Sequence, residues 1–147
     1  MSEKNACVSI FSDANALKQA LQQLQRQGME MQRVSVIGCN QYVQTMNFFT
    51  SQHSEIIETD KFGRLFIAGS ILHEFNAQMN NTVFEQAMNR VARALFKTGI
   101  SRQCIADYEA TLQQGDFLLI VHGPRQLVEL ACDILHCDSQ QVTVHIA

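Results

Sequence analysis

The segment GISRQCIADYEATLQQGDFLLIVHG, residues 99–123, contains the pattern that decides the fold. Ser101 is a favourable first residue for a helix, and Gly115 is a favourable residue to end one. Apolar residues recur between them at helical spacing, at Ile105, Tyr108 and Leu112. The run FLLIV at 117–121 follows at once and is apolar at both parities, which predicts a strand buried on both faces. Gly123 then predicts a turn.

Outward from this segment, the chain contains two strand-helix-strand units of the same design. Pro124 favours the start of a helix, and the alternation at 141–146 predicts a final strand. Near the amino terminus, ACVSIF at 6–11 predicts a strand, a helix follows up to Gly28, and RVSVI at 33–37 predicts another strand. The units align when Ile10 is laid on Ile120, Leu17 on Leu127 and Leu24 on Ile134.

Residues 39–98 separate the two units and show no sustained period, so we interpret them as a helical insertion within a single domain, 1–147. Its clearest helix is predicted to begin at the capping box Thr82-x-x-Glu85 and to end at Gly99. The apolar face of that helix would consist of Phe84, Met88, Val91 and Leu95.

Two such units in one antiparallel sheet predict an α+β, ferredoxin-like fold with both paired helices on one face. We expect these helices to cover a set of strand residues, Val8, Ile10, Leu118, Ile120, Val34, Val36, Val142 and Val144. The opposite face would then present an apolar patch, Phe11, Ile37, Phe117, Leu119 and Val121. Because such a patch rarely faces water, we expect the inserted helices, a second subunit or both to cover it, which predicts a homodimer.

Composition excludes several classes of protein. Of the 147 residues, 46% are hydrophobic and 17% charged, with a net charge of −3 and no basic stripe, so we expect no nucleic-acid partner. We expect no membrane segment, because no apolar run approaches the length of a spanning helix. The start, MSEKNACVSIFSD, lacks the features of a signal peptide. Five cysteines without C-x-x-C spacing indicate reduced thiols and a cytoplasmic protein.

The pattern GI-S-x(6)-YE-x(4)-QGDFLLIVHG, together with ACVSIFSD-x(3)-LKQALQQLQRQG and RVSVIG, resembles the bacterial general-stress, heat-induced proteins. In that family two βαβ halves flank a glycine-zipper helical segment. The resemblance covers residues 6–38 and 99–146 and implies a stress-associated, non-catalytic role with no active-site residues. The chain departs from the family in residues 39–98, which are polar and aromatic and contain only Gly63 and Gly69 as glycines.

The strongest candidate for a ligand site is His122 beside Gly123, where an imidazole and the start of a helix could hold an anion. Tyr108 could help to position such a ligand, although its spacing also fits core packing. Cys132, His136 and Cys137 cluster near the end of the last helix but lack a fourth metal ligand, so we expect no metal and no cofactor.

The sequence leaves two classes of function open, and a third is weaker. The first is a non-enzymatic stress or regulatory module that self-associates and binds a further protein. The alternative is a small-molecule sensor or enzyme with a cleft between the sheet and the inserted helices, lined by His122, Tyr108, Phe48, Phe49 and Phe62. The third is a cysteine-based metal or redox role.

Overall fold

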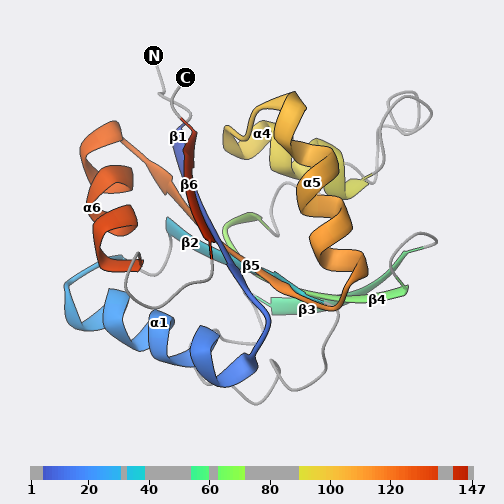
Figure 1. The fold of residues 1–147 in the computed structure, drawn as a ribbon, viewed down its shortest axis with the longest axis horizontal. Helices are drawn as coiled ribbons and strands as arrows, with labels where there is room; N and C mark the ends of the chain where they lie inside the picture. The colour runs from blue at the N-terminus through green and yellow to red at the C-terminus, as the bar shows by residue number, and fades with distance from the viewer. Residues whose placement is uncertain are drawn as a thin grey trace.

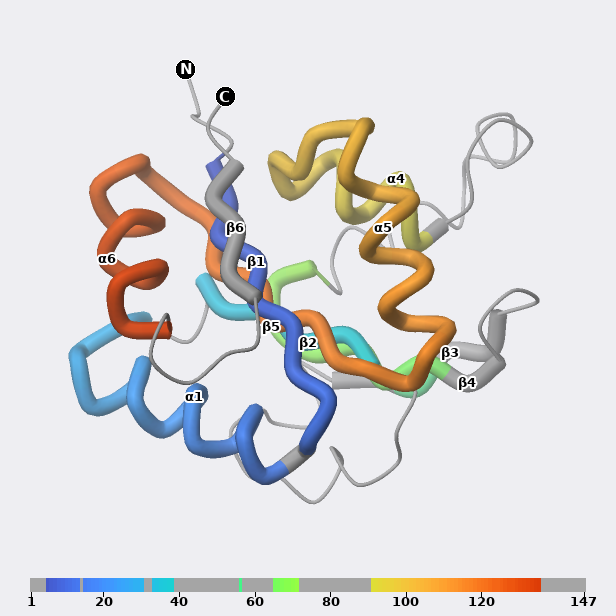
Figure 2. Tube along the Cα trace, in the orientation of Figure 1, coloured from blue at the N-terminus to red at the C-terminus, as the bar shows by residue number. Residues whose placement is uncertain are grey.

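An antiparallel sheet with helices on both faces forms the body of the molecule (Figures 1 and 2). The computed structural model describes residues 5–30, 33–38, 54–59, 63–71, 90–135 and 141–145. The elements are β1 (Asn5–Phe11), α1 (Ala14–Arg26), β2 (Val34–Gly38), β3 (Ser54–Thr59), β4 (Gly63–Gly69), α4 (Arg90–Thr98), α5 (Arg102–Gln113), β5 (Phe117–Gly123), α6 (Arg125–Leu135) and β6 (Gln141–His145). The predicted α+β class is therefore confirmed.

The six strands lie in the order β3-β4-β2-β5-β1-β6, and every neighbouring pair is antiparallel. The uniformly apolar β5 lies between β1 and β2, with Ile120 opposite Val8 on one side and Ser35 on the other. All five residues from Phe117 to Val121 are buried, as the unbroken apolar run predicts.

Helices α1 and α6 cover one face of the sheet. Asp13 starts α1, because its Oδ1 accepts a hydrogen bond of 3.1 Å from the backbone N–H of Asn15. The core on this face, which we call the α1/α6 core, consists of Cys7, Phe11, Leu17, Ala20, Leu21, Leu24, Met29, Val34, Val36, Phe66, Ala68, Phe117, Leu119, Val121, Val128, Ala131 and Leu135.

Helices α4 and α5 cover the other face. The core there, the α4/α5 core, consists of Ala6, Val8, Ile37, Leu65, Ile67, Ile71, Val91, Ala92, Ala94, Leu95, Ile100, Ile105, Tyr108, Leu112, Leu118 and Ile120. The helix that ends at Gly99, α4, packs on the face opposite α1 and α6, but of the predicted patch only Ile37 lies on that face. Ser101 precedes α5 as predicted, but its side chain makes no capping hydrogen bond.

The predicted assignment of strand residues to faces is wrong for β1 and β5. Val8, Ile10, Leu118 and Ile120 lie on the α4/α5 side, whereas Phe11, Phe117, Leu119 and Val121 lie against α1 and α6. Val34, Val36 and Ile37 lie on the predicted faces. Because both sets of alternating side chains in β1 and β5 are apolar, their sequences do not reveal which set faces α1 and α6 and which set faces α4 and α5.

The predicted interface patch of Phe11, Ile37, Phe117, Leu119 and Val121 is therefore not an exposed surface. Each of these five side chains is at most 1% exposed, covered by helices of the same chain. Any self-association has to use other surfaces.

The insertion differs from the expectation of helices alone. Residues 54–59 and 63–69 form β3 and β4, which extend the sheet beyond β2. The helical expectation is confirmed only for α4, while the capping box at Thr82 and Glu85 lies outside the described residues, as do Phe48, Phe49 and Phe62. No helix among the described ranges is long and apolar enough to cross a membrane.

Candidate functional site

His122 lies near the end of β5, opposite Ala6 of β1, with its side chain half-buried. It shares the parity of Leu118 and Ile120, so it belongs to the α4/α5 side of the sheet. The next residue, Gly123, ends β5 immediately before α6. The sequence therefore correctly placed His122 at the junction between a buried strand and a helix.

A row of hydrogen-bonding side chains joins three strands at this end of the sheet. His122 Nε2 lies 2.5 Å from Ser70 Oγ, and Ser70 Oγ lies 3.1 Å from Ser35 Oγ. The backbone N–H of Ile71 donates to Ser35 Oγ at 3.0 Å. Ser35 is fully buried on β2, and Ser70 follows β4 directly. We call these residues the Ser35–Ser70–His122 row.

The backbone donor anchors one end of the row. Because the Ile71 N–H can only donate, Ser35 Oγ accepts from it, whereas either hydroxyl can be the donor between Ser35 and Ser70. Ser70 donates to Nε2 of His122 in one tautomer of the ring and accepts from it in the other. Every hydroxyl in the row is engaged in this way, which is what buried polar groups require.

A serine hydroxyl hydrogen-bonded to an imidazole is also the first half of a nucleophile and base pair. Here, however, Ser70 Oγ is hydrogen-bonded to both Ser35 and His122, so the oxygen that a nucleophile must use is engaged on both sides. The row is therefore better suited to joining β2, β4 and β5 than to attacking a substrate.

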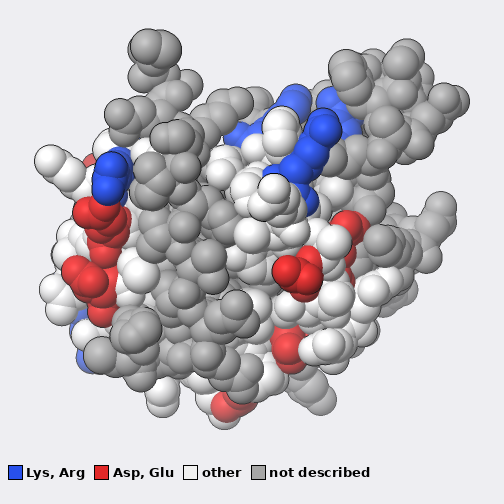
Figure 3. All heavy atoms as spheres, turned by 45° about the horizontal axis from the view of Figure 1, so that its top comes forward, with Lys and Arg blue, Asp and Glu red and all other residues white. Residues whose placement is uncertain are grey.

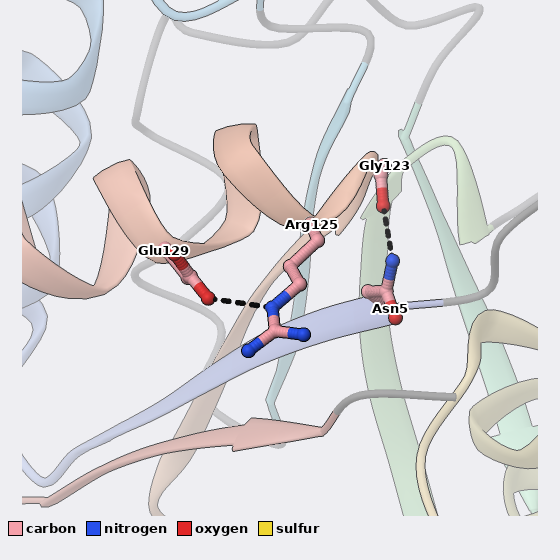
Figure 4. Close-up of polar contacts among 4 residues, drawn as sticks. All are labelled: Asn5, Gly123, Arg125 and Glu129. Atoms are coloured by element: carbon pink, nitrogen blue, oxygen red, sulfur yellow. Dashed lines mark hydrogen bonds and ion pairs between the residues drawn. The ribbon is translucent and has the colours of Figure 1, made fainter.

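The surroundings of Gly123 are filled by protein atoms. Asn5 Nδ2 donates to the carbonyl oxygen of Gly123 at 3.4 Å, and on the next turn Arg125 Nε pairs with Glu129 Oε1 at 2.8 Å (Figure 4). A Cβ atom added to Gly123 would lie 2.7 Å from Arg33 Nη1. The imidazole of His122 is thus engaged with Ser70 on the sheet, while Arg33 and Asn5 occupy the space around Gly123.

Tyr108 was the third predicted ligand residue, and the structure places it within the α4/α5 core at 4% exposure. It packs there with Ile105 and Leu112, the partners that its helical spacing predicted. Tyr108 is therefore part of the core, whereas His122 belongs to the polar row at the end of the sheet.

The predicted cysteine and histidine cluster is only partly described. Cys132 lies on α6, but His136 and Cys137 fall outside the described residues. Among the described residues, no group of three or more His, Cys, Asp or Glu side chains is arranged to hold a metal ion. Cys132 lies close to Cys7 of β1, and the pKa of Cys7 is raised by burial and, to a smaller extent, by Cys132.

The surface presents an aromatic side chain at the corner between α4 and α5. Phe96 is 46% exposed, and the guanidinium carbon of Arg102 lies 5.2 Å from the centre of its ring, in the geometry of a cation-π contact. Lys97 is exposed beside it, and no acidic residue occurs between positions 86 and 106. We call Phe96, Lys97 and Arg102 the basic corner.

Helix α6 presents a surface of the opposite character. Leu130 is 49% exposed, and the exposed carboxylates of Glu129 and Asp133 lie on the same helix. We call these three residues the acidic ridge. Figure 3 shows Lys and Arg side chains gathered at the upper part of the α4 and α5 side, with Asp and Glu side chains lower on that side, and a column of Asp and Glu side chains with a basic group at its upper end over the α6 side.

Sequence reasoning missed Ser35, Ser70 and the contact between Cys7 and Cys132. Ser35 and Ser70 are 35 positions apart, and Cys7 and Cys132 are separated by almost the whole chain, so no local spacing relates the partners. The basic corner did leave a local signal, the run of four basic residues from Arg90 to Arg102.

Comparison of the chain with protein-family models, with curated proteins and with solved structures gives no match. The function of the chain therefore has to be inferred from its own geometry and from the sequence resemblance described above.

Proposed function

We propose that this chain is a non-enzymatic, stress-associated or regulatory module that acts by self-association and by binding other proteins. The observation that supports this most strongly is the half-exposed ring of Phe96 beneath the guanidinium of Arg102. Aromatic and Arg side chains are the residues most enriched among those that dominate binding energy at protein interfaces. Completing the burial of a Phe side chain that is already half covered contributes about 1 kcal/mol.

The acidic ridge of a second copy fits the basic corner. Leu130 offers an exposed apolar side chain to Phe96, and Asp133 offers a carboxylate to Lys97 or Arg102. Glu129 is already paired with Arg125, so Asp133 is the carboxylate available for this contact. Complementary charge around an apolar centre favours correct orientation and fast association.

The two surfaces differ from each other, so two copies can form this contact once, head to tail, or twice, reciprocally, in an isologous interface. Two reciprocal contacts would close a dimer, which is the state we expect, whereas one contact per pair would leave an open chain of subunits. This mode of association replaces the predicted sheet-face interface, whose residues are buried within the chain.

The fold supports a module of this kind. We assign it to the ferredoxin-like class on the order β2-β5-β1-β6 and on the two units β1-α1-β2 and β5-α6-β6. The stress association rests on the family resemblance, and the placement in the cytoplasm rests on the cysteines, which are unpaired by disulfides at Cys7, Cys104 and Cys132. The sensor or enzyme alternative is weaker, because Tyr108 packs in the core and His122 binds Ser70.

Light scattering coupled to size exclusion, over a range of protein concentrations, tests the association. Phe96→Ala and Leu130→Ala should each shift the molecular mass towards the monomer. Ile56→Ala is the matched control, because Ile56 is also exposed, at 43%, but lies on β3. Lys97→Glu and Asp133→Lys should each weaken association, and the double variant should restore it. A wild-type protein that remains monomeric at every concentration contradicts the proposal.

A further inference from the structure

The backbone beneath the basic corner is fixed by the turn between α4 and α5. The N–H of Gly99 donates to the carbonyl oxygen of Phe96 at 3.1 Å, and the N–H of Ile100 donates to that of Leu95 at 3.2 Å. With Gly99 at a φ of +114°, these two bonds form the Schellman motif that ends many helices. Ile100 is 1% exposed and belongs with Leu95 to the α4/α5 core. The turn therefore presents Phe96 and Arg102 from an ordered backbone, which lowers the entropy cost of binding.

The charge around Phe96 is basic, and Figure 3 shows Lys and Arg side chains at the upper part of the α4 and α5 side. Residues 86–106 contain four basic residues and no acidic residue. The positions three and four residues after Arg102 on α5 are Ile105 and Ala106, so no carboxylate lies at the helical spacing that would pair with Arg102. The ring of Phe96 offers no hydrogen-bond acceptor, so the N–H donors of Arg102 remain suited to both oxygens of a carboxylate. A carboxylate beside an apolar side chain is the complement of this surface.

We propose that the basic corner recognises other proteins by an acidic segment, in which one apolar side chain lies between carboxylates, and that this segment competes there with a second copy of the chain. The inference rests on the proposed function, and it names the partner and the regulation of the same surface. The acidic ridge shows the chemistry required, since Leu130 lies beside Glu129 and Asp133 on α6.

Competition follows because Phe96 presents a single half-exposed ring. An apolar side chain from another protein and the acidic ridge of a second copy cannot cover the same ring at once. A partner that binds only the free basic corner shifts the equilibrium away from the self-associated state. Binding of another protein therefore converts the self-associated chain into a complex with that protein.

A protein segment fits this surface better than a nucleic acid. The exposed half of the Phe96 ring is covered best by an apolar side chain, and the burial of such a pair supplies affinity. The carboxylates on either side supply orientation and a faster association rate. The whole chain has a net charge of −3, which repels an extended polyanion.

The test uses the full chain and a short fluorescein-labelled peptide in which one leucine is flanked on both sides by glutamates. Fluorescence anisotropy measures the dissociation constant of the peptide directly, whether or not the chain self-associates. We expect the peptide to bind, and we expect Phe96→Ala and Lys97→Glu each to raise its dissociation constant by at least about fivefold. Ile56→Ala and Lys18→Glu are the matched controls, because both residues are also exposed but lie on β3 and α1. These two variants should bind the peptide as the wild type does.

Two altered peptides test the chemistry without changing the protein. Replacing the leucine by serine, or the glutamates by glutamines, should each weaken binding by a similar factor. A serine peptide, or a single-stranded oligonucleotide, that binds the wild type as tightly as the original peptide overturns the proposal, because charge alone would then be recognised.

Light scattering at increasing peptide concentration tests the competition. The molecular mass of the wild type should fall to that of a monomer with one bound peptide. A mass that stays at the dimer while anisotropy shows the peptide bound overturns the competition and leaves the proposed self-association standing. A chain that is monomeric without peptide contradicts the self-association instead. In that case a dependence of peptide binding on Phe96 supports the recognition of acidic segments, and peptide binding that does not depend on Phe96 overturns it.

Discussion

His122 shows how a single polar residue at the end of an apolar strand is accommodated. Its Nε2 needs a partner where β5 leaves the core, and Ser70 supplies one from a different part of the chain. Ser70 is in turn held by Ser35, which is anchored by the backbone of Ile71. Because the sequence separation within the row is large, each hydrogen bond fixes the insertion against the central strands.

A double-mutant cycle on Ser70→Ala and His122→Ala tests this row. Each single change should lower the free energy of unfolding by about 1 kcal/mol, the typical net contribution of a hydrogen bond. The double variant should lose about 1 kcal/mol less than the sum, because both changes remove the same bond. Urea denaturation provides the measurement. As a control, the losses in free energy of unfolding from Ser70→Ala and Gln113→Ala should add, because Gln113 lies on the exposed side of α5. If the losses from Ser70→Ala and His122→Ala also add, the coupling between these two residues is refuted.

Cys7 gives a second prediction at this scale, on the pH dependence of stability. Its pKa rises from 9.0 to about 12 on folding, mainly because of burial. Between these values the unfolded chain has lost the proton that the folded chain retains, so the free energy of unfolding should fall as the pH rises, by at most about 1.4 kcal/mol per pH unit. Below pH 9 this contribution is constant.

Denaturation of the wild type and of Cys7→Ala at a series of alkaline pH values isolates this contribution from the titration of Tyr and Lys side chains. The stability of the wild type relative to the variant should decline across that interval. Cys104→Ala should follow the wild type. Parallel curves for the wild type and Cys7→Ala would show that the Cys7 thiol does not resist ionisation in the folded protein.

The junction between β4 and β2 depends on a close approach of two backbones. Gly69 ends β4 opposite Ser35, with φ at +92°. A Cβ atom at this position would lie 2.0 Å from the carbonyl oxygen of Val34, too close for any side chain. Gly115, before β5, has nearly the same φ of +91°, but no atom lies within 4 Å of its added Cβ. Comparing substitutions at the two glycines therefore distinguishes the cost of backbone strain from the cost of a steric clash.

Alanine at each of these glycines should have different effects. Gly115→Ala should cost about 1–2 kcal/mol, the strain of a left-handed conformation in a residue with a Cβ atom. Gly69→Ala should cost clearly more, because β4 must also move away from β2. Thermal or urea denaturation measures both. Equal losses would mean that the strands separate without difficulty, and that the Ser35 to Ser70 hydrogen bond does not hold them together.

At the scale of elements, the sequence predicts the positions of the strands better than the side of the sheet that each strand residue faces. The predicted strands at 6–11, 33–37 and 117–121 correspond to β1, β2 and β5, and the glycine stops at Gly28, Gly99 and Gly115 follow α1, α4 and α5. The side of the sheet that each residue of β1 and β5 faces could not be predicted, because both parities are apolar. Ser35 has a polar side chain within a buried strand, and only Ile71 and Ser70, distant in sequence, explain its position.

The β3 and β4 hairpin was missed for a different reason. Residues 54–59, SEIIET, combine three β-branched residues with two carboxylates, and the apolar run at 65–68 is only four residues long. Neither segment has a period long enough to distinguish a strand from a short helix. The hairpin gains its stability from tertiary pairing, since β4 pairs with β2 along Ser35 to Gly38.

At the scale of the whole molecule, the sheet separates two cores, and each face is closed by its own pair of helices (Figure 1). The described core residues of β1, β2, β4 and β5 are buried, whereas Ile56 of β3 is 43% exposed, so contacts with other molecules are directed to helix surfaces and to the ends and edge of the sheet. The basic corner lies on the helices over one face, and the acidic ridge lies on the helices over the other. A molecule with a basic corner on one side and an acidic ridge on the other is expected to associate by contact between these two unlike surfaces.

The salt dependence of self-association should reveal this electrostatic component. Raising the ionic strength from about 0.01 M to about 1 M shortens the Debye length from about 30 Å to about 3 Å, which screens exposed charges such as Lys97 and Asp133. The dissociation constant, measured by sedimentation equilibrium, should therefore rise with salt in the wild type. The double variant Lys97→Glu, Asp133→Lys should show the same trend, because the attraction is preserved with its signs exchanged. Each single variant should show a weaker dependence, since one attraction has been replaced by a repulsion that salt relieves. A dissociation constant that falls with salt in the wild type would indicate that apolar contact alone drives association, and Phe96 and Leu130 would then meet without help from the charges around them.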